Sequence, residues 1–378
     1  MRIAMIGCKG IPAASALGGG IETHVEELAT RLVARGHEVM VYVRPYANPE
    51  RKTSWRGVEL ITLPSLQSKH LDAITHTFFA SLHVLSQKVD IVHYHGVGPS
   101  TLAWIPRLFK WSSRVVVTFH SRDRFHEKWN WFARAYLAFG EWTSVTFPHR
   151  TIAVSHIIQL FVQRMYGARR VEYIPNGVEV VKKLPGTEFV KAVGLETGGY
   201  FFTLSRIQPH KAIDDAIRAF AGVETDKKLV IIGSPNGAGD EEYFQELKRL
   251  AVHDGRVILL GRKTGVELHQ LMSHSYAMIH PSRHEGLSVA ILEAMSFAKL
   301  VIMSDIPENR ELVDHSGIAY KVGDIKELRE TLQWVVNDPE LVKERGLRAQ
   351  TSIQKLYSWD SVVLRTEQLY FSLFPKSV

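Results

Sequence analysis

The stretch from Tyr276 to Glu293 reads Tyr-Ala-Met-Ile-His-Pro-Ser-Arg-His-Glu-Gly-Leu-Ser-Val-Ala-Ile-Leu-Glu, and it predicts a strand, a turn and a helix in that order. An apolar strand ends before Pro281, and an apolar helix begins near Ser288. Glu285 and free backbone N–H groups therefore lie at the carboxyl end of a strand. In open α/β sheets ligands bind at this end, where the N-terminus of a helix favours anionic groups.

The same alternation of strand and helix extends over the chain in two blocks. Strands are predicted at residues 2–7, 37–43, 58–62, 90–95, 114–119, 151–154 and 171–174, and again at 200–204, 228–232, 256–259, 276–279, 300–303 and 317–320. Helical periodicity fills most of the gaps, most clearly over residues 22–35. Such alternation predicts parallel sheets with right-handed crossovers. The fold class is therefore α/β, with two doubly wound, Rossmann-like domains, residues 1–178 and 179–357, facing a central cleft.

Length, cysteine content and the distribution of apolar residues exclude several classes of protein. The 378 residues, 45% of them hydrophobic, are too many for one comfortable core. Cys8 is the only cysteine, so a disulfide framework is excluded and a reducing compartment is favoured. No apolar run approaches the roughly 20 residues that span a bilayer. We expect a cytoplasmic protein, and a peripheral position on the inner face of the membrane stays open.

Charge is distributed unevenly between the two blocks. Residues 1–178 carry 21 Lys and Arg against 12 Asp and Glu, a net charge of +9, whereas the remainder carries 25 against 27. A basic first block could attract phosphate-bearing ligands, anionic lipid or nucleic acid, or it could be a solvated surface. Since no nucleic-acid-binding motif occurs, we expect no nucleic acid partner beyond a nucleotide ligand.

Two carboxylates and two cations are the strongest candidates for chemistry. Glu285 and Glu293 flank the predicted start of one helix, and Arg206 and Lys211 follow the strand 200–204. Arg offers a planar fork for phosphate oxygens and Lys offers a point charge, so this pair suits a diphosphate. A rival interpretation makes the glutamates the acid and nucleophile of a glycoside hydrolase, in which the two cations would have no function.

Glycines and histidines add further candidates in the first block. Gly19 and Gly20 lie between the first strand and the first helix, where a backbone without side chains can approach a ligand closely. His120 ends the strand 114–119. His93 and His95 point to one face of their strand, as a metal-binding pair would, but the sequence shows no third ligand, and no metal site is predicted.

Aromatic residues recur at helical spacing within residues 122–142. They are Phe125, Trp129, Phe132, Tyr136 and Phe139, with Arg122, Arg124, Lys128 and Arg134 nearby. Such a stripe is typical of a helix packed on its sheet, and it also suits a helix lying in a membrane interface. Both interpretations stay open at this point.

The pattern Glu-Gly-Leu-Ser-x-x-x-x-Glu over residues 285–293 resembles the donor-site motif of the family-4 glycosyltransferases, which are retaining enzymes of the GT-B fold. Bacterial members that assemble polysaccharides are the most similar. The order of the other motifs supports the resemblance over essentially the whole chain. These motifs are Gly18-Gly19-Gly20, Thr118-Phe119-His120, Ile174-Pro175-Asn176-Gly177-Val178, Ser205-Arg206 with Lys211, Ile231-Ile232-Gly233, Leu260-Gly261 and Ser358-Trp359.

This resemblance implies transfer of a hexosyl group from a nucleoside-diphosphate sugar to a hydroxyl acceptor, a lipid-linked or other glycan. The nucleotide sugar is a substrate, and neither a cofactor nor a metal is implied; the chain also lacks any Asp-x-Asp sequence. The implied catalytic residues are His120, Glu285, Arg206 and Lys211. The implied donor-binding residues are Gly19, Gly20, Arg206, Lys211, Gly286, Leu287, Ser288 and Glu293.

The resemblance also carries finer implications. Glu293 would accept hydrogen bonds from the ribose hydroxyls, Glu285 would bind the sugar hydroxyls, and His120 would contact the transferred sugar. A last helix, residues 358–373, would pack back on the first domain. Two departures concern the donor site, because Ala212 replaces a usual glycine and residues 306–309 replace a glycine pair.

Other functions share this fold class. A sugar-nucleotide epimerase or a phosphorylase of the GT-B fold is the main alternative, because a fold by itself does not specify chemistry. A basic nucleic-acid-binding protein is a more distant one.

Overall fold

The computed structural model describes residues 1–13, 18–68, 71–122, 124, 131–179, 186–235 and 238–375. Two compact units form within the chain. Unit 1 comprises Met1–Gly177 and Trp359–Val378, and unit 2 comprises Val178–Ser358. The chain therefore leaves unit 1 at Gly177 and returns to it at Trp359.

Unit 1 is built on one sheet. Its strands are β1 (Arg2–Ile6), β2 (Glu38–Val43), β3 (Ser54–Trp55), β4 (Val58–Thr62), β5 (Ile91–His95), β6 (Arg114–Phe119), β7 (Arg150–Ala153) and β8 (Val171–Tyr173). They form an eight-stranded sheet in the order β3-β4-β2-β1-β5-β6-β7-β8. The described strands pair in parallel, except that β3 runs antiparallel to β4.

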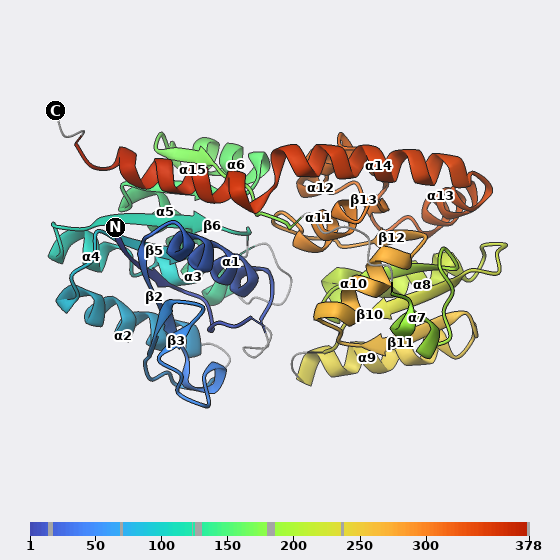
Figure 1. The fold of residues 1–378 in the computed structure, drawn as a ribbon, viewed down its shortest axis with the longest axis horizontal. Helices are drawn as coiled ribbons and strands as arrows, with labels where there is room; N and C mark the ends of the chain where they lie inside the picture. Colours follow the sequence, from blue (N-terminus) through green and yellow to red (C-terminus); the bar gives the residue numbers. More distant parts are fainter. Residues whose placement is uncertain are drawn as a thin grey trace. The chain divides into compact units, whose positions relative to one another are not determined.

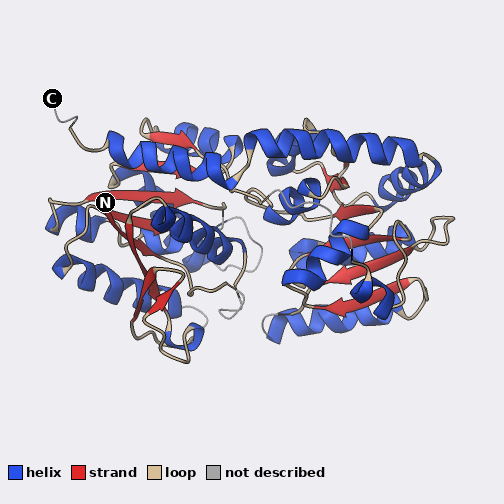
Figure 2. Ribbon diagram, in the orientation of Figure 1, coloured by secondary structure: helices blue, strands red, loops and turns tan. Residues whose placement is uncertain are grey.

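Helices cover both faces of this sheet (Figure 2). They are α1 (Gly20–Ala34), the 3-10 turn η1 (Pro45–Ala47), α2 (Asp72–Ser86), α3 (Val97–Ser100), α4 (Trp104–Phe109), α5 (Trp131–Thr146), α6 (His156–Tyr166) and α15 (Trp359–Ser372). Side chains alternate across a strand. Ile3 and Met5 of β1 join the core beneath α1 and α15, whereas Ala4 and Ile6 join the core that includes α2.

The last helix, α15, belongs to unit 1 although unit 2 precedes it in the chain; it is red in Figure 1, beside the blue and green elements of unit 1. The Tyr370 hydroxyl lies 2.6 Å from Nδ1 of His93 in β5. Trp359 packs so closely on the Gly177 backbone that a Cβ there would come within 2.4 Å of the indole ring. These contacts hold the C-terminal helix in the core of unit 1.

Unit 2 repeats the architecture with a smaller sheet. Its strands are β9 (Tyr200–Leu204), β10 (Lys228–Ile232), β11 (Val257–Gly261), β12 (Ala277–His280), β13 (Leu300–Ser304) and β14 (Ile318–Tyr320). The six-stranded sheet has the order β11-β10-β9-β12-β13-β14, and the described pairs are parallel. The helical elements are α7 (Glu188–Ala192), η3 (Pro209–Lys211), α8 (Ile213–Phe220), α9 (Ala238–Ala251), α10 (Gly265–His274), α11 (Val289–Ser296), α12 (Pro307–Val313), α13 (Ile325–Asn337) and α14 (Pro339–Leu356).

The predicted fold class is confirmed, because each unit is a doubly wound, parallel α/β sheet. The predicted strands agree with the observed ones to within one or two residues. Strand β3 was not predicted, since two residues are too few to show an alternating pattern. Within the part of the chain that the structure describes, no helix is long and apolar enough to cross a bilayer.

The sheet order determines where loops can form a site. In unit 2, β9 lies between β10 and β12, so the connections after β9 and β12 leave in opposite directions. A crevice forms at the carboxyl ends of strands where the winding reverses in this way, and ligands of doubly wound sheets bind there. The corresponding position in unit 1 lies between β1 and β5.

Candidate active site

The turn between β12 and α11 has the predicted strand-turn-helix form, and tertiary contacts hold it in place. The Arg283 N–H donates to the His210 carbonyl at 2.8 Å, which ties the turn to the η3 segment after β9. The Arg283 guanidinium lies 3.3 Å from the Asp215 carboxylate of α8. The Ser304 hydroxyl donates to the Ser282 carbonyl. The turn is therefore fixed against both neighbouring connections.

Glu285 is the centre of the site in unit 2. Its Oε1 accepts hydrogen bonds from Lys211 Nζ at 2.6 Å and from His280 Nε2 at 2.8 Å. The Glu285 side chain is only 10% exposed. Burial by itself would raise the pKa of this carboxyl, but the Lys211 ammonium and the His280 hydrogen bond together hold that pKa well below its usual range. Glu285 is therefore an ionised, oriented acceptor.

Lys211 reaches Glu285 through an unusual backbone conformation. The next residue, Ala212, has φ 49° and ψ 40°, the left-handed region that favours glycine. It is fully buried. The alanine that replaces the usual glycine therefore has a strained backbone conformation. Lys211 nevertheless lies beside the Glu285 carboxylate.

Arg206 behaves differently from Lys211. It lies two residues beyond β9, and its side chain is exposed. Across the described residues it forms no ion pair. Of the two predicted phosphate-binding cations, the structure joins only Lys211 to Glu285.

The start of α11 carries the remaining donor-site candidates. Gly286 and the buried Leu287 precede Ser288, whose side chain makes no capping hydrogen bond to the first turn. The first N–H groups of a helix have no partner within the helix, and they favour an anion. Glu293 is half-buried one turn further on. These residues therefore lie on one element, as the motif predicted.

The glycine loop of unit 1 donates to an acceptor on α1 that was not predicted from the sequence. The Gly19 N–H donates to Glu22 Oε2 at 2.8 Å, and the Lys9 N–H donates to Glu22 Oε1 at 3.1 Å. Gly20 is the first residue of α1. The Glu22 carboxylate therefore accepts a hydrogen bond from the Gly19 N–H, which would otherwise be available to a phosphate.

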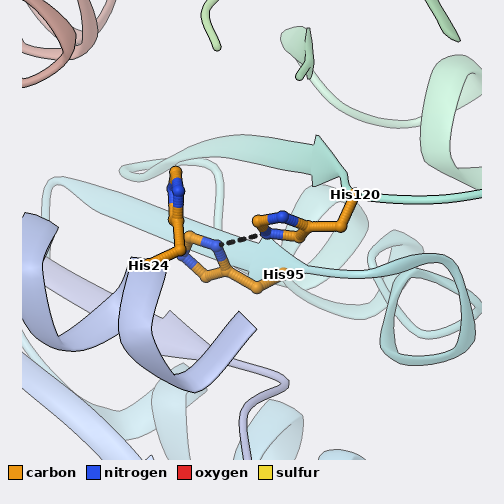
Figure 3. A group of neighbouring side chains, drawn as sticks. All are labelled: His24, His95 and His120. Atoms are coloured by element: carbon orange, nitrogen blue, oxygen red, sulfur yellow. Dashed lines mark hydrogen bonds between the residues drawn. The ribbon is translucent and has the colours of Figure 1, made fainter. Parts of the chain in front are cut away.

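His120 is part of a histidine cluster at the carboxyl ends of β5 and β6 (Figure 3). Its Nε2 lies 3.3 Å from Nδ1 of His95, and His24 of α1 packs against both rings. All three side chains are buried. Burial lowers the pKa of His24 to about 4 and the pKa values of His95 and His120 well below 6.5. The three rings are therefore neutral at neutral pH.

His93, which the sequence paired with His95, has other partners. Its Nδ1 lies 2.6 Å from the Tyr370 hydroxyl, and its Nε2 lies 2.7 Å from Thr118 Oγ1. Both ring nitrogens of His93 are thus used inside the core of unit 1.

Of the five side chains in the predicted aromatic stripe of residues 122–142, the structure describes Tyr136 and Phe139. Phe125, Trp129 and the side chain of Phe132 lie outside the described residues. The Tyr136 hydroxyl is hydrogen-bonded to Thr101 at 2.7 Å, whereas Phe139 is 47% exposed. The other exposed aromatic residues of α5 are Trp131, at 80%, and Trp142, at 43%. Tyr136 is half-buried and bonded to Thr101, whereas Trp131, Phe139 and Trp142 are exposed.

His280 and His24 were not among the predicted site residues. His280 directly follows the predicted strand 276–279 and lies five residues before Glu285. A sequence does not show that the turn folds this imidazole back onto the carboxylate. His24 lies on a helix 71 residues before His95, and only the packing of α1 on the sheet brings the two rings together.

Both halves of the chain match known families. Residues 18–182 match the family described as Glycosyltransferase Family 4, and residues 187–351 match the family described as Glycosyl transferases group 1. Among the relatives is the gpi3 subunit of the phosphatidylinositol N-acetylglucosaminyltransferase of Schizosaccharomyces pombe. It is 23% identical over 371 residues, covering 94% of this chain and 78% of that protein.

Solved structures share the fold over almost the full length. The sucrose-phosphate synthase of Thermosynechococcus elongatus is 19% identical, with a TM-score of 0.86 and a coverage of 99% of both chains. HepE of Anabaena in complex with UDP-glucose is 18% identical, with a TM-score of 0.79, and the match covers 98% of this chain and 100% of that one. At these identities the likeness establishes the fold.

Proposed function

Because the chain belongs to the family-4 glycosyltransferases, we propose that it is a retaining enzyme that moves a hexosyl group from a nucleoside-diphosphate sugar to a hydroxyl of a lipid-linked or other glycan. The observation that carries the proposal is the buried pair of Lys211 and Glu285. This pair lies after β9 and β12, where the winding of the sheet reverses and ligands of such sheets bind.

The diphosphate of the donor would bind to Lys211, to Arg206 and to the first N–H groups of α11. Negative charge grows on the leaving nucleoside diphosphate as the glycosidic bond breaks. Cations and amides placed there stabilise the transition state more than the ground state. We therefore propose that no divalent metal takes part in the transfer. The solved complex of HepE with UDP-glucose supports a nucleotide sugar as the donor.

The sugar would bind to Glu285. Its two hydrogen bonds, from Lys211 and His280, reduce its nucleophilicity and leave the second carboxylate oxygen to accept from sugar hydroxyls. A covalent glycosyl intermediate on Glu285 is therefore disfavoured. We propose that the leaving phosphate takes the proton of the acceptor hydroxyl on the same face of the sugar. His120 keeps its proposed contact with the transferred sugar.

The acceptor is proposed to be lipid-linked, with unit 1 lying at an anionic membrane surface on the cytoplasmic side. Trp131, Phe139 and Trp142 form an exposed aromatic group on α5. Residues 1–178 carry a net charge of +9, and basic surface near anionic lipid contributes about 1 kcal/mol per residue. The name of the Schizosaccharomyces pombe relative, a phosphatidylinositol glycosyltransferase, is in keeping with such an acceptor.

A donor screen tests the proposal. UDP-, GDP-, dTDP- and ADP-sugars are added separately, and the melting temperature is measured. We expect one nucleotide class to stabilise the protein, by about 2.7 kcal/mol at a hundredfold excess over Kd. NMR of the product formed with a glycan acceptor should show that the anomeric configuration of the donor is kept.

Other outcomes would identify other functions. Conversion of the donor to an epimer without acceptor would indicate an epimerase, and a requirement for inorganic phosphate would indicate a phosphorylase. If no sugar nucleotide is bound, the proposal is wrong, and a salt-dependent gel shift would then favour nucleic acid.

A further inference from the structure

We propose that His24, His95 and His120 of unit 1 form a binding site for one Zn²⁺ ion. The three residues come from α1, from the last position of β5 and from the position after β6, and their rings face one another (Figure 3). A ring nitrogen of each residue lies within 4.8 Å of a ring nitrogen of both others. The described part of the chain contains no other group of three such ligands.

The spacing of one pair already suits the ion. Zn²⁺ binds imidazole nitrogen at about 2.0–2.1 Å with tetrahedral geometry, which places neighbouring ligand atoms about 3.3–3.4 Å apart. Nδ1 of His95 and Nε2 of His120 are 3.3 Å apart. Only the His24 ring would need to approach them, by a rotation of a side chain on α1. The two strands that carry the other ligands are adjacent in the sheet.

The chemistry of the donor set favours Zn²⁺ over the hard cations. Three imidazoles with no carboxylate suit zinc and its neighbours in the transition series, whereas Mg²⁺ and Ca²⁺ require oxygen ligands. Three histidines with a fourth position left for water are a known zinc ligand set. The rings are neutral, so each has a lone pair to offer.

The three rings are buried, and two of their nitrogens lack a hydrogen-bond partner within the described residues. His95 is fully buried, and His24 and His120 are 4% and 6% exposed. Nδ1 of His24 and Nε2 of His95 are buried without a hydrogen-bond partner in the described structure. A buried polar nitrogen without a partner opposes folding. A hydrogen bond between His95 Nδ1 and His120 Nε2 satisfies one nitrogen on each of those two rings. An ion held by these two nitrogens and by His24 Nδ1 would give His24 Nδ1 a partner, and His95 Nε2 would stay without one.

The neighbouring His93 is not available as a fourth ligand. Both of its nitrogens are already bonded, to Tyr370 and to Thr118. It packs beside His95, with ring centroids 4.1 Å apart, and supports that ring from the core side. The proposed ligand set is therefore three histidines and not four.

Titration of the metal-free, untagged protein tests the proposal. Calorimetry should detect one Zn²⁺ per chain, and the melting temperature should rise with Zn²⁺. Co²⁺ in place of Zn²⁺ should give the strong visible absorption of a four-coordinate site. His24→Gln and His95→Gln should each weaken Zn²⁺ binding by about a hundredfold or more, since even the loss of an outer-shell partner costs about 10- to 100-fold.

His253→Gln is the matched control, because His253 is an exposed histidine of unit 2. This variant should bind Zn²⁺ like the unchanged protein, and Mg²⁺ should not compete. If the unchanged protein takes up no stoichiometric Zn²⁺, the proposal is overturned. It is also overturned if His24→Gln binds as tightly as His253→Gln. Should His95→Gln fail to fold, His24→Gln decides the question, because His24 lies on helix α1 and not in the sheet.

Discussion

At the scale of single residues, Lys211 and Glu285 form one unit and not two separate contacts. From the sequence, Lys211 was expected to face the diphosphate and Glu285 to face the sugar. The structure joins them in a buried ion pair at 2.6 Å. Removing either partner leaves the other charge buried, which is more costly than the loss of an exposed pair.

We therefore predict that Lys211→Ala and Glu285→Gln reduce transfer in a non-additive way. Loss of one partner of a desolvated pair costs roughly 2–5 kcal/mol, or on the order of 30- to several-thousand-fold in rate. The double variant should lose less than the product of the single effects, since neither charge is then stranded. Initial rates of all four proteins measure the coupling. The exposed pair Lys326–Glu330, altered in the same way, is the control and should change little. If the loss of rate in the double variant equals the product of the two single losses, Lys211 and Glu285 do not act as a pair.

Ala212 supplies a second prediction at this scale. Its left-handed backbone costs an L-residue about 1–2 kcal/mol, which glycine avoids at the expense of a small buried methyl group and some chain entropy. We predict that Ala212→Gly keeps or slightly raises stability. Ala216→Gly in the middle of α8, also buried, should lower it by about 1 kcal/mol or more. Calorimetric melting compares the two; an equal loss in both would exclude strain at Ala212.

At the scale of elements, strand β5 makes unit 1 sensitive to acid. Burial, aided by His24, lowers the pKa of His93 to about 3. In the unfolded chain the same ring takes up a proton below about pH 6.5. Between these values the unfolded state binds more protons, so the stability that His93 contributes is complete above pH 6.5 and falls as the pH drops toward 3.

We predict that the free energy of unfolding falls by up to about 1.4 kcal/mol per pH unit for His93 in this range, and by a similar slope for His24, whose pKa is about 4. Urea midpoints measured between pH 7.5 and 5 give the slope. His93→Gln should flatten it, whereas the exposed control His253→Gln should not. A slope unchanged by His93→Gln would place the proton uptake elsewhere.

At the scale of the whole molecule, transfer and metal binding should oppose each other. The proposed transfer draws its positive charge from Lys211 and Arg206, so exhaustive chelation should leave the rate unchanged or raise it. Zn²⁺ at His120 would occupy a ring proposed to contact the sugar, and added Zn²⁺ should therefore inhibit. Rates with chelator, Mg²⁺, Mn²⁺ and Zn²⁺ test this. An activity lost on chelation and restored by Mg²⁺ or Mn²⁺ would contradict the metal-independent mechanism.

The local sequence pattern was sufficient to predict most strands of both sheets. Strands such as Tyr200–Leu204 and Lys228–Ile232 were predicted to the residue, because buried parallel strands are short apolar runs between turn residues. The motif from Glu285 to Glu293 likewise predicted its own turn and helix, since strand end, glycine and helix start follow within a few residues. Strands, turns and helix starts depend on residues close together in the chain, so they could be predicted from the sequence.

Contacts between distant segments were decided only by tertiary structure. Lys211 and Glu285 are 74 positions apart, and their meeting requires that β9 and β12 be neighbours in the sheet. The meeting of His24 with His95 and His120 requires α1 to pack over the ends of β5 and β6. The bond between Tyr136 and Thr101, and the exposure of Phe139, depend on the face that α5 presents to the rest of unit 1. Periodicity specifies an element, but strand order and packing select which side chains meet, and those choices are made by the buried surface of the whole unit.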